Sequence, residues 1–147
     1  METHITDMSN CSSTANTNRN QAFRIFYQNV NGLRRKTTEF HLNLISEDYD
    51  IIVLTETNLT SDIYDNELFD NRYSIFRQDR NLNNTSKESG GGIIVAIKNH
   101  YNAQAVPNIN ENEQKVESLW IRCTLLGHTI YICACYFSPP STTSIPT

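Results

Sequence analysis

The chain has 147 residues and a formal net charge of −4 at pH 7, from 12 basic and 16 acidic side chains. This length suits one domain with a sizeable core, and the acidic balance excludes a polybasic protein that binds nucleic acid through its bulk charge, though not a local basic stripe. No apolar run approaches the roughly 18 residues of a membrane span, and the polar N-terminus lacks the apolar segment of a secretory signal. We therefore expect an intracellular protein, nuclear or cytoplasmic, that is not secreted and not bound to a membrane.

The first half of the chain predicts a strand, a helix and a second strand, preceded by a polar leader. Residues 1–21 are rich in Ser, Thr and Asn, a composition typical of disordered segments. Residues 23–30 are rich in aromatic and β-branched side chains, which predicts a strand. Apolar residues at helical spacing predict a helix over 37–46, and the apolar run 51–54 predicts a strand buried on both faces. Together these elements predict a βαβ unit with a right-handed crossover.

The second half of the chain predicts mainly strands and loops. Polar residues after Glu56 predict a loop with a short helix, and a second polar loop is expected over 100–113. Strands are expected over 73–77, 93–98, 116–126 and 129–137, with Gly127-His128 as the turn of the last hairpin. This order of elements favours an α/β fold with a mixed β-sheet and flanking helices.

The last predicted strand favours a truncated domain. It is among the most apolar segments of the chain, and a single helix is clearly predicted before it, so one face of the sheet would lie bare. We divide the chain into a disordered polar leader (1–21), the folded part of a truncated domain (22–141), and a truncated polar end (142–147). The sequence leaves the oligomeric state open.

The four cysteines give little support to a metal site or a disulfide. Cys133 and Cys135 lie two residues apart in a predicted strand and therefore share one face. The sequence has no Cys-x-x-Cys pair with a nearby pair of histidines that would indicate zinc. We interpret the cysteines as ordinary buried thiols in a reducing compartment.

Three polar side chains at the ends of predicted strands are candidates for chemistry: Asn29, Glu56 and Tyr136. Ligands collect at the carboxyl ends of strands in open α/β sheets, so Asn29 and Glu56 would meet at one edge if their strands are parallel. A carboxylate beside a neutral amide suits Mg²⁺, which often takes one or two carboxylates and fills its other positions with water and substrate phosphate. Each residue also has an ordinary explanation, namely a solvated strand end for Glu56, turn chemistry for Asn29 and packing for Tyr136.

Four segments, in this order along the chain, resemble one known family: FRIFYQNVNGLRRK (23–36), YDIIVLTETNL (49–59), FRQDR with the later SGGGIIVAIK (76–98), and ESLWIRCTLLGHTIYICACYFSPPS (117–141). They resemble the endonuclease/exonuclease/phosphatase superfamily. Within it, the chain is most similar to the apurinic-type endonuclease domain of non-LTR retrotransposons of the LINE-like, jockey type. The resemblance runs from about residue 22 to residue 141 and so covers nearly all of the chain that is expected to fold.

The resemblance implies a truncated four-layer α/β sandwich, with two packed sheets and helices outside, in which residues 22–141 form the N-terminal part of the domain and its C-terminal half is missing. It implies Mg²⁺-dependent hydrolysis of a phosphodiester, with Mn²⁺ as a substitute metal, that nicks target DNA and leaves a 3′-hydroxyl to prime reverse transcription. Asn29 would contact the scissile phosphate or the attacking water, Glu56 would be the metal ligand, and Tyr136 would hydrogen-bond the phosphate. The implied partners are the target duplex and a reverse transcriptase domain in the same polypeptide of the parent element.

Basic residues beside these motifs are candidates for contacts with DNA. Arg34 and Arg35 belong to a basic run just after the Asn29 motif, and the solvated start of a helix is the alternative explanation for them. The resemblance places Arg77 and Arg80 toward the DNA, near a triple glycine where a duplex backbone could approach closely. The alternative for this second pair is a surface loop with its charges in water.

The resemblance is incomplete toward the C-terminus. The family's Asp-x-Asn pair after the Tyr motif and its terminal Asp-His pair are both missing, and the eleven residues after Tyr136 include no Asp, Asn or His. A general base typically contributes about 10²–10⁴-fold to a rate, and a lone carboxylate holds Mg²⁺ weakly. We therefore expect this chain by itself to be nearly or wholly inactive. The alternatives are a phosphatase-type phosphoesterase of the same superfamily and a non-catalytic retroelement remnant or DNA-binding module.

Overall fold

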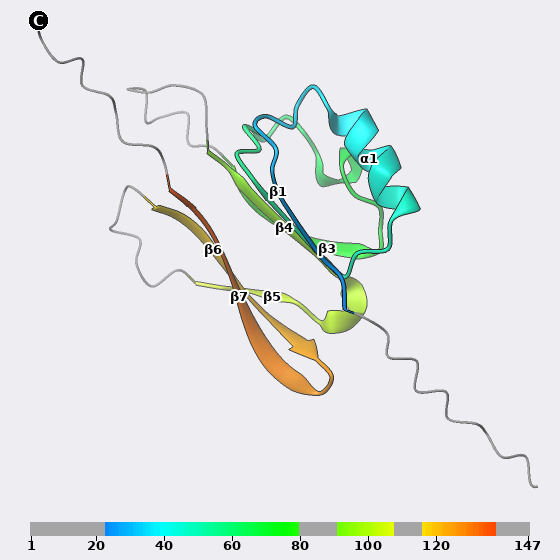
Figure 1. Ribbon diagram of the computed structural model, residues 1–147. Coiled ribbons are helices and arrows are strands. Elements are labelled where there is room, and N and C mark those ends of the chain that lie inside the picture. The colour runs from blue at the N-terminus through cyan, green and yellow to red at the C-terminus, as the bar shows by residue number, and fades with distance from the viewer. Residues whose placement is uncertain (1–22, 80–90, 108–115, 138–147) are drawn as a thin grey trace, which may run out of the picture.

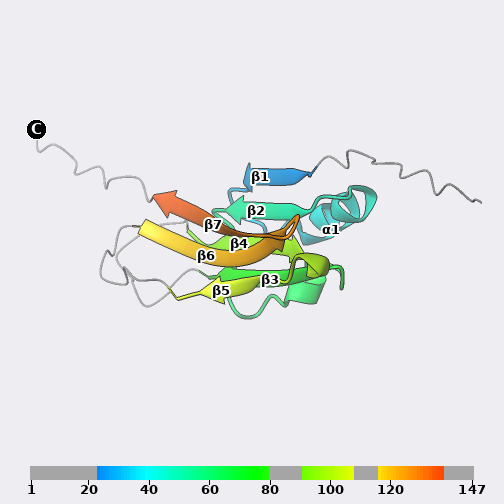
Figure 2. The ribbon, with the colours of Figure 1, turned by 90° about the horizontal axis from the view of Figure 1, so that it is seen from below.

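The structure is a computed structural model that describes residues 23–79, 91–107 and 116–137. Two β-sheets pack face to face, and a helix covers the far side of the first sheet (Figures 1 and 2). This confirms the predicted α/β class with a mixed sheet and a flanking helix. The predicted leader (1–21), the polar end (142–147) and Arg80 lie outside the described residues.

The elements follow the predicted order closely. Their bounds are β1 Ile25–Asn29, α1 Thr37–Ser46, β2 Ile51–Thr55, η1 Asp65–Glu67, β3 Tyr73–Gln78, β4 Ile93–Lys98, η2 Asn99–Tyr101, β5 Gln104–Val106, β6 Val116–Leu125 and β7 His128–Phe137, where η marks a short 3₁₀ helix. The helix has the predicted bounds, whereas β5 and most of η2 occupy a segment predicted as a loop. Of the helices in these ranges, none is long and apolar enough to cross a membrane.

The first sheet is mixed and has the strand order β1-β2-β4-β3. β1 and β2 run parallel with α1 between them along the chain, which confirms the βαβ unit. β4 lies antiparallel to both β2 and β3. Asn29 pairs with Thr55, so the carboxyl ends of the two parallel strands lie side by side at one edge of the sheet.

The second sheet is antiparallel and has the order β5-β6-β7. The residues alone predicted one mixed sheet, but the last hairpin belongs to a second sheet, as the family resemblance implied. Its turn is Leu126–Gly127 and not Gly127-His128, because Leu125 pairs with His128. Both turn residues have positive φ, 49° and 78°, which is the mark of a type I′ turn and suits the twist of a two-residue hairpin.

Alternating side chains along β2 and β4 build two separate cores. Ile52 and Leu54 face α1 and belong to the cluster between the helix and the first sheet. Ile51, Ile93 and Val95 point the other way and belong to the cluster between the two sheets. The predicted burial of strand 51–54 on both faces is therefore confirmed.

The outward face of the second sheet carries large exposed apolar side chains, among them Trp120, Tyr131 and Phe137. Cys133 and Cys135 lie on this face too, with 3.2 Å between their Sγ atoms. Both are exposed, so the prediction of buried thiols is wrong for this pair. The reason is strand alternation, since Ala134 between them turns toward the inter-sheet core and is buried there.

A buried carboxylate holds together the end of the first sheet that lies opposite Glu56. Asp50 is 8% exposed, and its carboxylate accepts hydrogen bonds from the Arg24 backbone N–H (2.8 Å), the Tyr101 hydroxyl (2.8 Å) and the Lys98 ammonium (3.3 Å). Burial acts to raise the pKa of Asp50, but these donors outweigh it and the pKa is lowered. The ionised carboxylate thus joins the start of β1, the end of β4 and η2.

Asp50→Asn is expected to lower the free energy of unfolding by about 1–3 kcal/mol at neutral pH, because hydrogen bonds to a charged acceptor are lost. A lowered folded-state pKa means that the carboxylate contributes stability above its unfolded pKa of about 4 and loses that contribution as the pH falls through the folded-state value. Urea unfolding between pH 7 and pH 3 should show the difference between wild type and variant shrinking at the acid end. Asp48→Asn, at a mostly exposed position, is the control, and a difference independent of pH would contradict the assignment.

Candidate active site

The site lies where β1 and β2 end, at the edge predicted from the sequence. Backbone hydrogen bonds continue the pairing of the two strands beyond their last residues. The Val30 N–H donates to the Thr55 carbonyl at 2.9 Å, and the Gly32 N–H donates to the Glu56 carbonyl at 2.7 Å. The loop after β1 and the residue after β2 are therefore held against each other.

Glu56 has an unusual backbone conformation that the neighbouring strand holds in place. Its φ is 55°, in the left-handed region that costs energy for a residue with a side chain. The following N–H groups bond to the segment that leads into β4, Thr57 to the Gly92 carbonyl at 3.3 Å and Asn58 to the Gly91 carbonyl at 3.0 Å. These bonds on the C-terminal side, and the Gly32 bond on its own carbonyl, fix the direction in which the half-buried Glu56 side chain leaves the chain.

Tyr136 reaches Glu56 from the other sheet. It lies on the inward face of β7, packed against the inter-sheet core, and its hydroxyl lies close enough to the Glu56 carboxylate to interact with it electrostatically. Burial and the neighbouring Glu56 carboxylate raise the pKa of Tyr136, and the nearby charge of Glu117 acts in the same direction. The phenol is thus kept protonated and can donate. The structure therefore brings together two of the three predicted site residues.

Asn29 lies at the same edge of the first sheet as Glu56, on the side that faces the second sheet. The Tyr27 hydroxyl lies 3.3 Å from Thr55 Oγ1, and Asn29 follows Tyr27 by two residues along β1, so both point toward the side of the second sheet. The Asn29 side chain is exposed, and its Oδ1 accepts a hydrogen bond from the Asn31 N–H at 3.2 Å. Its amide N–H₂ group finds no acceptor among the described residues. Asn29 makes no described contact with Glu56 or Tyr136, but its exposed amide lies at the end of the strand that pairs with β2.

The residues present fit a divalent cation that is held by few protein ligands. Glu56 supplies one carboxylate, and the described residues contain no group of three or more His, Cys, Asp or Glu side chains that could hold a metal. Mg²⁺ is often bound through one or two carboxylates, with water and phosphate completing its shell. Two buried oxygens that follow Glu56 in the chain, Thr57 Oγ1 and Asn58 Oδ1, have no hydrogen-bond partner within the part of the chain that the structure describes. Buried polar atoms normally find such a partner, so these two are exceptions.

The predicted DNA-binding arginines differ in their solvent exposure and in their contacts within the chain. Arg34 is more than half exposed and pairs with Asp62, while Arg35 is exposed. Arg77 is only 14% exposed and is engaged by its own chain, so the structure gives no support to a DNA contact through it. Arg80 lies outside the described residues.

Glu117 is a residue of this region that the sequence analysis did not identify. It lies opposite Tyr136 in the β6–β7 ladder, and its Oε2 accepts a hydrogen bond from the Gly92 N–H at 2.7 Å. The signal that could have found it is the hairpin register, which pairs an acidic residue directly with the candidate tyrosine. The misplaced turn concealed this pair.

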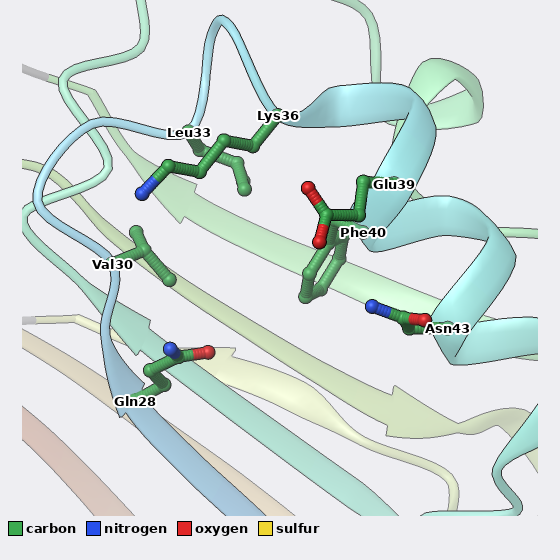
Figure 3. Close-up of a pocket in the computed structure, with 7 residues that line it drawn as sticks. All are labelled: Gln28, Val30, Leu33, Lys36, Glu39, Phe40 and Asn43. Atoms are coloured by element: carbon green, nitrogen blue, oxygen red, sulfur yellow. The ribbon is translucent and has the colours of Figure 1, made fainter.

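A separate pocket of about 260 Å³ lies between the end of β1 and α1 (Figure 3). Its polar lining comes from Gln28, Lys36, Glu39 and Asn43, around apolar side chains such as Phe40. Gln28 alternates with its neighbour along β1, so this pocket lies on the opposite side of the first sheet from Asn29. It is distinct from the edge where Glu56 and Tyr136 meet.

Comparison with known proteins supports the fold. No protein-family model matches the chain, and no curated protein matches it. Five chains of known structure match. Among them is the crystal structure of the AP endonuclease LMAP from Leishmania major, with a TM-score of 0.54 and 18% identity over 78% of this chain. The chain spans 40% of the length of that structure, and at this identity the likeness shows a common fold.

Proposed function

We propose that this site belongs to a Mg²⁺-dependent phosphodiester hydrolase that nicks DNA. The observation that carries the proposal is the approach of the Tyr136 hydroxyl to the Glu56 carboxylate, at the edge where the parallel strands β1 and β2 end in Asn29 and Thr55. An acid, a protonated phenol and an exposed amide at one edge can bind a metal and a phosphate together. The structural similarity to an AP endonuclease agrees with a nuclease-type phosphodiesterase.

Each side chain would have a distinct role. Glu56 would hold the divalent ion, which supplies charge stabilisation at the phosphate and activation of water. The Tyr136 hydroxyl, kept protonated, would turn from the carboxylate to a phosphate oxygen when substrate binds. The Asn29 amide would donate to the phosphate or orient the attacking water. Donors that are already in place when charge develops lower the barrier most.

The substrate proposed is duplex DNA, approached along its phosphate backbone. Arg34 and Arg35 follow the Asn29 loop and expose their side chains near the site, where phosphate contacts would position a duplex. The motif series further supports proposing the target-site endonuclease of a non-LTR retrotransposon, which would act with a reverse transcriptase in the same polypeptide.

Binding of the metal is tested with Mn²⁺, whose unpaired electrons broaden nearby amide signals in an NMR titration. We expect the strongest broadening at Glu56, Thr57 and Gly32, and we expect Glu56→Gln to abolish it. Glu39→Gln, an exposed position on α1, is the matched control and should leave the pattern unchanged. Broadening that survives Glu56→Gln would refute the proposed metal site.

The reaction is tested by nicking of supercoiled plasmid in Mg²⁺, with protein in excess. We expect nicking to be slow at most, because the sequence lacks the further motifs that the resemblance requires, and we expect Glu56→Gln to remove whatever is present. Faster hydrolysis of a small phosphomonoester than of DNA would refute the nuclease function and favour a phosphatase. Salt-sensitive DNA binding, with no cleavage that is lost in Glu56→Gln, would favour a binding module.

A further inference from the structure

We propose that Glu117 is a positioning residue for the metal-binding acid: its carboxylate holds the Gly91–Gly92 segment, and that segment holds the backbone of Glu56. The inference rests on the proposed function, since it assigns a role in presenting the proposed metal ligand. It concerns a side chain on β6, in the sheet opposite to the one that carries Glu56.

A continuous series of contacts connects the two acids. Glu117 Oε2 accepts a hydrogen bond from the Gly92 N–H at 2.7 Å. The Gly92 carbonyl in turn accepts from the Thr57 N–H at 3.3 Å, and the Gly91 carbonyl accepts from the Asn58 N–H at 3.0 Å. These last two amides immediately follow Glu56. A short distance to a charged acceptor makes the first bond the strongest of the series.

The contact with Glu117 requires glycine at positions 91 and 92, for the space beside the backbone and for its conformation. A Cβ placed on Gly91 would lie 2.7 Å from Glu117 Oε1, closer than real side chains approach. Gly91 and Gly92 both have positive φ, 94° and 89°, a conformation that glycine adopts without strain. The carboxylate therefore lies directly over a backbone that only glycine allows, and both glycines are buried.

The strained conformation of Glu56 explains what this contact contributes. A residue other than glycine at a φ of 55° is held there only when its surroundings determine it. The bonds from Thr57 and Asn58 to the glycine segment provide that determination on one side, and Glu117 fixes the glycine segment from the second sheet. Loss of the Glu117 acceptor would free the segment and let the Glu56 side chain turn away from the edge.

The experiment compares Glu117→Gln, which keeps an acceptor oxygen, with Glu117→Leu, which removes it. In a Mn²⁺ titration followed by amide broadening, we expect Glu117→Leu to weaken binding by about 10–100-fold, as loss of a residue that orients a ligand usually does. Glu117→Gln should bind nearly as tightly as wild type. If both variants weaken binding equally, the charge of Glu117 acts on the metal directly and the positioning role is refuted.

Amide hydrogen exchange without metal tests the same role independently of the proposed function. We expect Glu117→Leu to lose protection at Thr57 and Asn58 while the β6–β7 ladder stays protected, and we expect Glu117→Gln to keep both. Unchanged protection in Glu117→Leu would overturn the inference even if Mn²⁺ binds. Failure of wild type to bind Mn²⁺, with protection lost as expected, would refute the metal site alone and leave the contact series in place.

Discussion

Ile94→Ala is expected to lower the free energy of unfolding by about 2–5 kcal/mol, the usual cost of truncating a fully buried aliphatic side chain. Ile94 is completely buried in β4, between its ladder partners Leu54 of β2 and Arg77 of β3. Its side chain belongs to the core between the first sheet and α1. Backbone hydrogen bonds to strands on both sides leave little freedom to collapse around the cavity, so we expect a value above the lower limit.

Urea unfolding followed by circular dichroism measures this loss. Ile25→Ala is the matched control, because Ile25 is 60% exposed on the edge strand β1 and its truncation should change stability by less than about 0.5 kcal/mol. Equal losses for the two variants would mean that β4 is not the centre of the folded sheet.

The fold could be predicted from the sequence wherever hydrophobic pattern and chain continuity agree. The helix over 37–46 and the apolar strands β2 and β4 follow directly from periodicity, and the structure confirms them. β5 has only three residues, Gln104–Val106, none of them buried, so it leaves no apolar pattern to detect. The division into two sheets depends on contacts between distant segments, which local pattern does not contain.

The hairpin turn shows how a local error affects the site. Leu126 is 90% exposed and adopts a positive φ that leucine rarely favours, so the sequence pointed to Gly127-His128 instead. With that turn, Glu117 would pair two residues further along, with Ser138. The true register places Glu117 opposite Tyr136, beside Glu56. The meeting of acid and phenol could be predicted because both belong to recognisable motifs. The position of Glu117 could not be predicted, because it follows only from the correct register of the β6–β7 hairpin.

Arg77 differs most from its sequence-based prediction: the motif predicted a contact with DNA, but its guanidinium is hydrogen-bonded within the chain. Its guanidinium donates to the Asp79 carboxylate through Nε and Nη2, to Asp65 through Nη1, and to the backbone carbonyls of Ile63 and Thr60. A guanidinium has five N–H donors, and these contacts use all of them. Arg77 therefore fastens the loop after β2 to the end of β3. A DNA phosphate could bind it only by breaking one of these bonds.

Arg77→Gln is expected to lower the free energy of unfolding by about 1–3 kcal/mol, because a neutral amide has two donors and no charge and cannot reproduce the planar fork. Urea unfolding measures this, and fluorescence anisotropy with a labelled duplex measures DNA affinity in the folded variant. We expect that affinity and its salt dependence to stay unchanged.

Arg34→Ala and Arg35→Ala are the comparison, because these exposed arginines lie beside the Asn29 loop. Each should weaken binding and reduce the salt slope by about one for every phosphate that the variant no longer neutralises. If Arg77→Gln weakens DNA binding as much as they do, the hydrogen bonds of Arg77 within the chain open when DNA binds, and the interaction predicted from the motif is real. If the variant loses stability but keeps its DNA affinity, Arg77 stabilises the fold, and recognition of the duplex depends on the loop after β1.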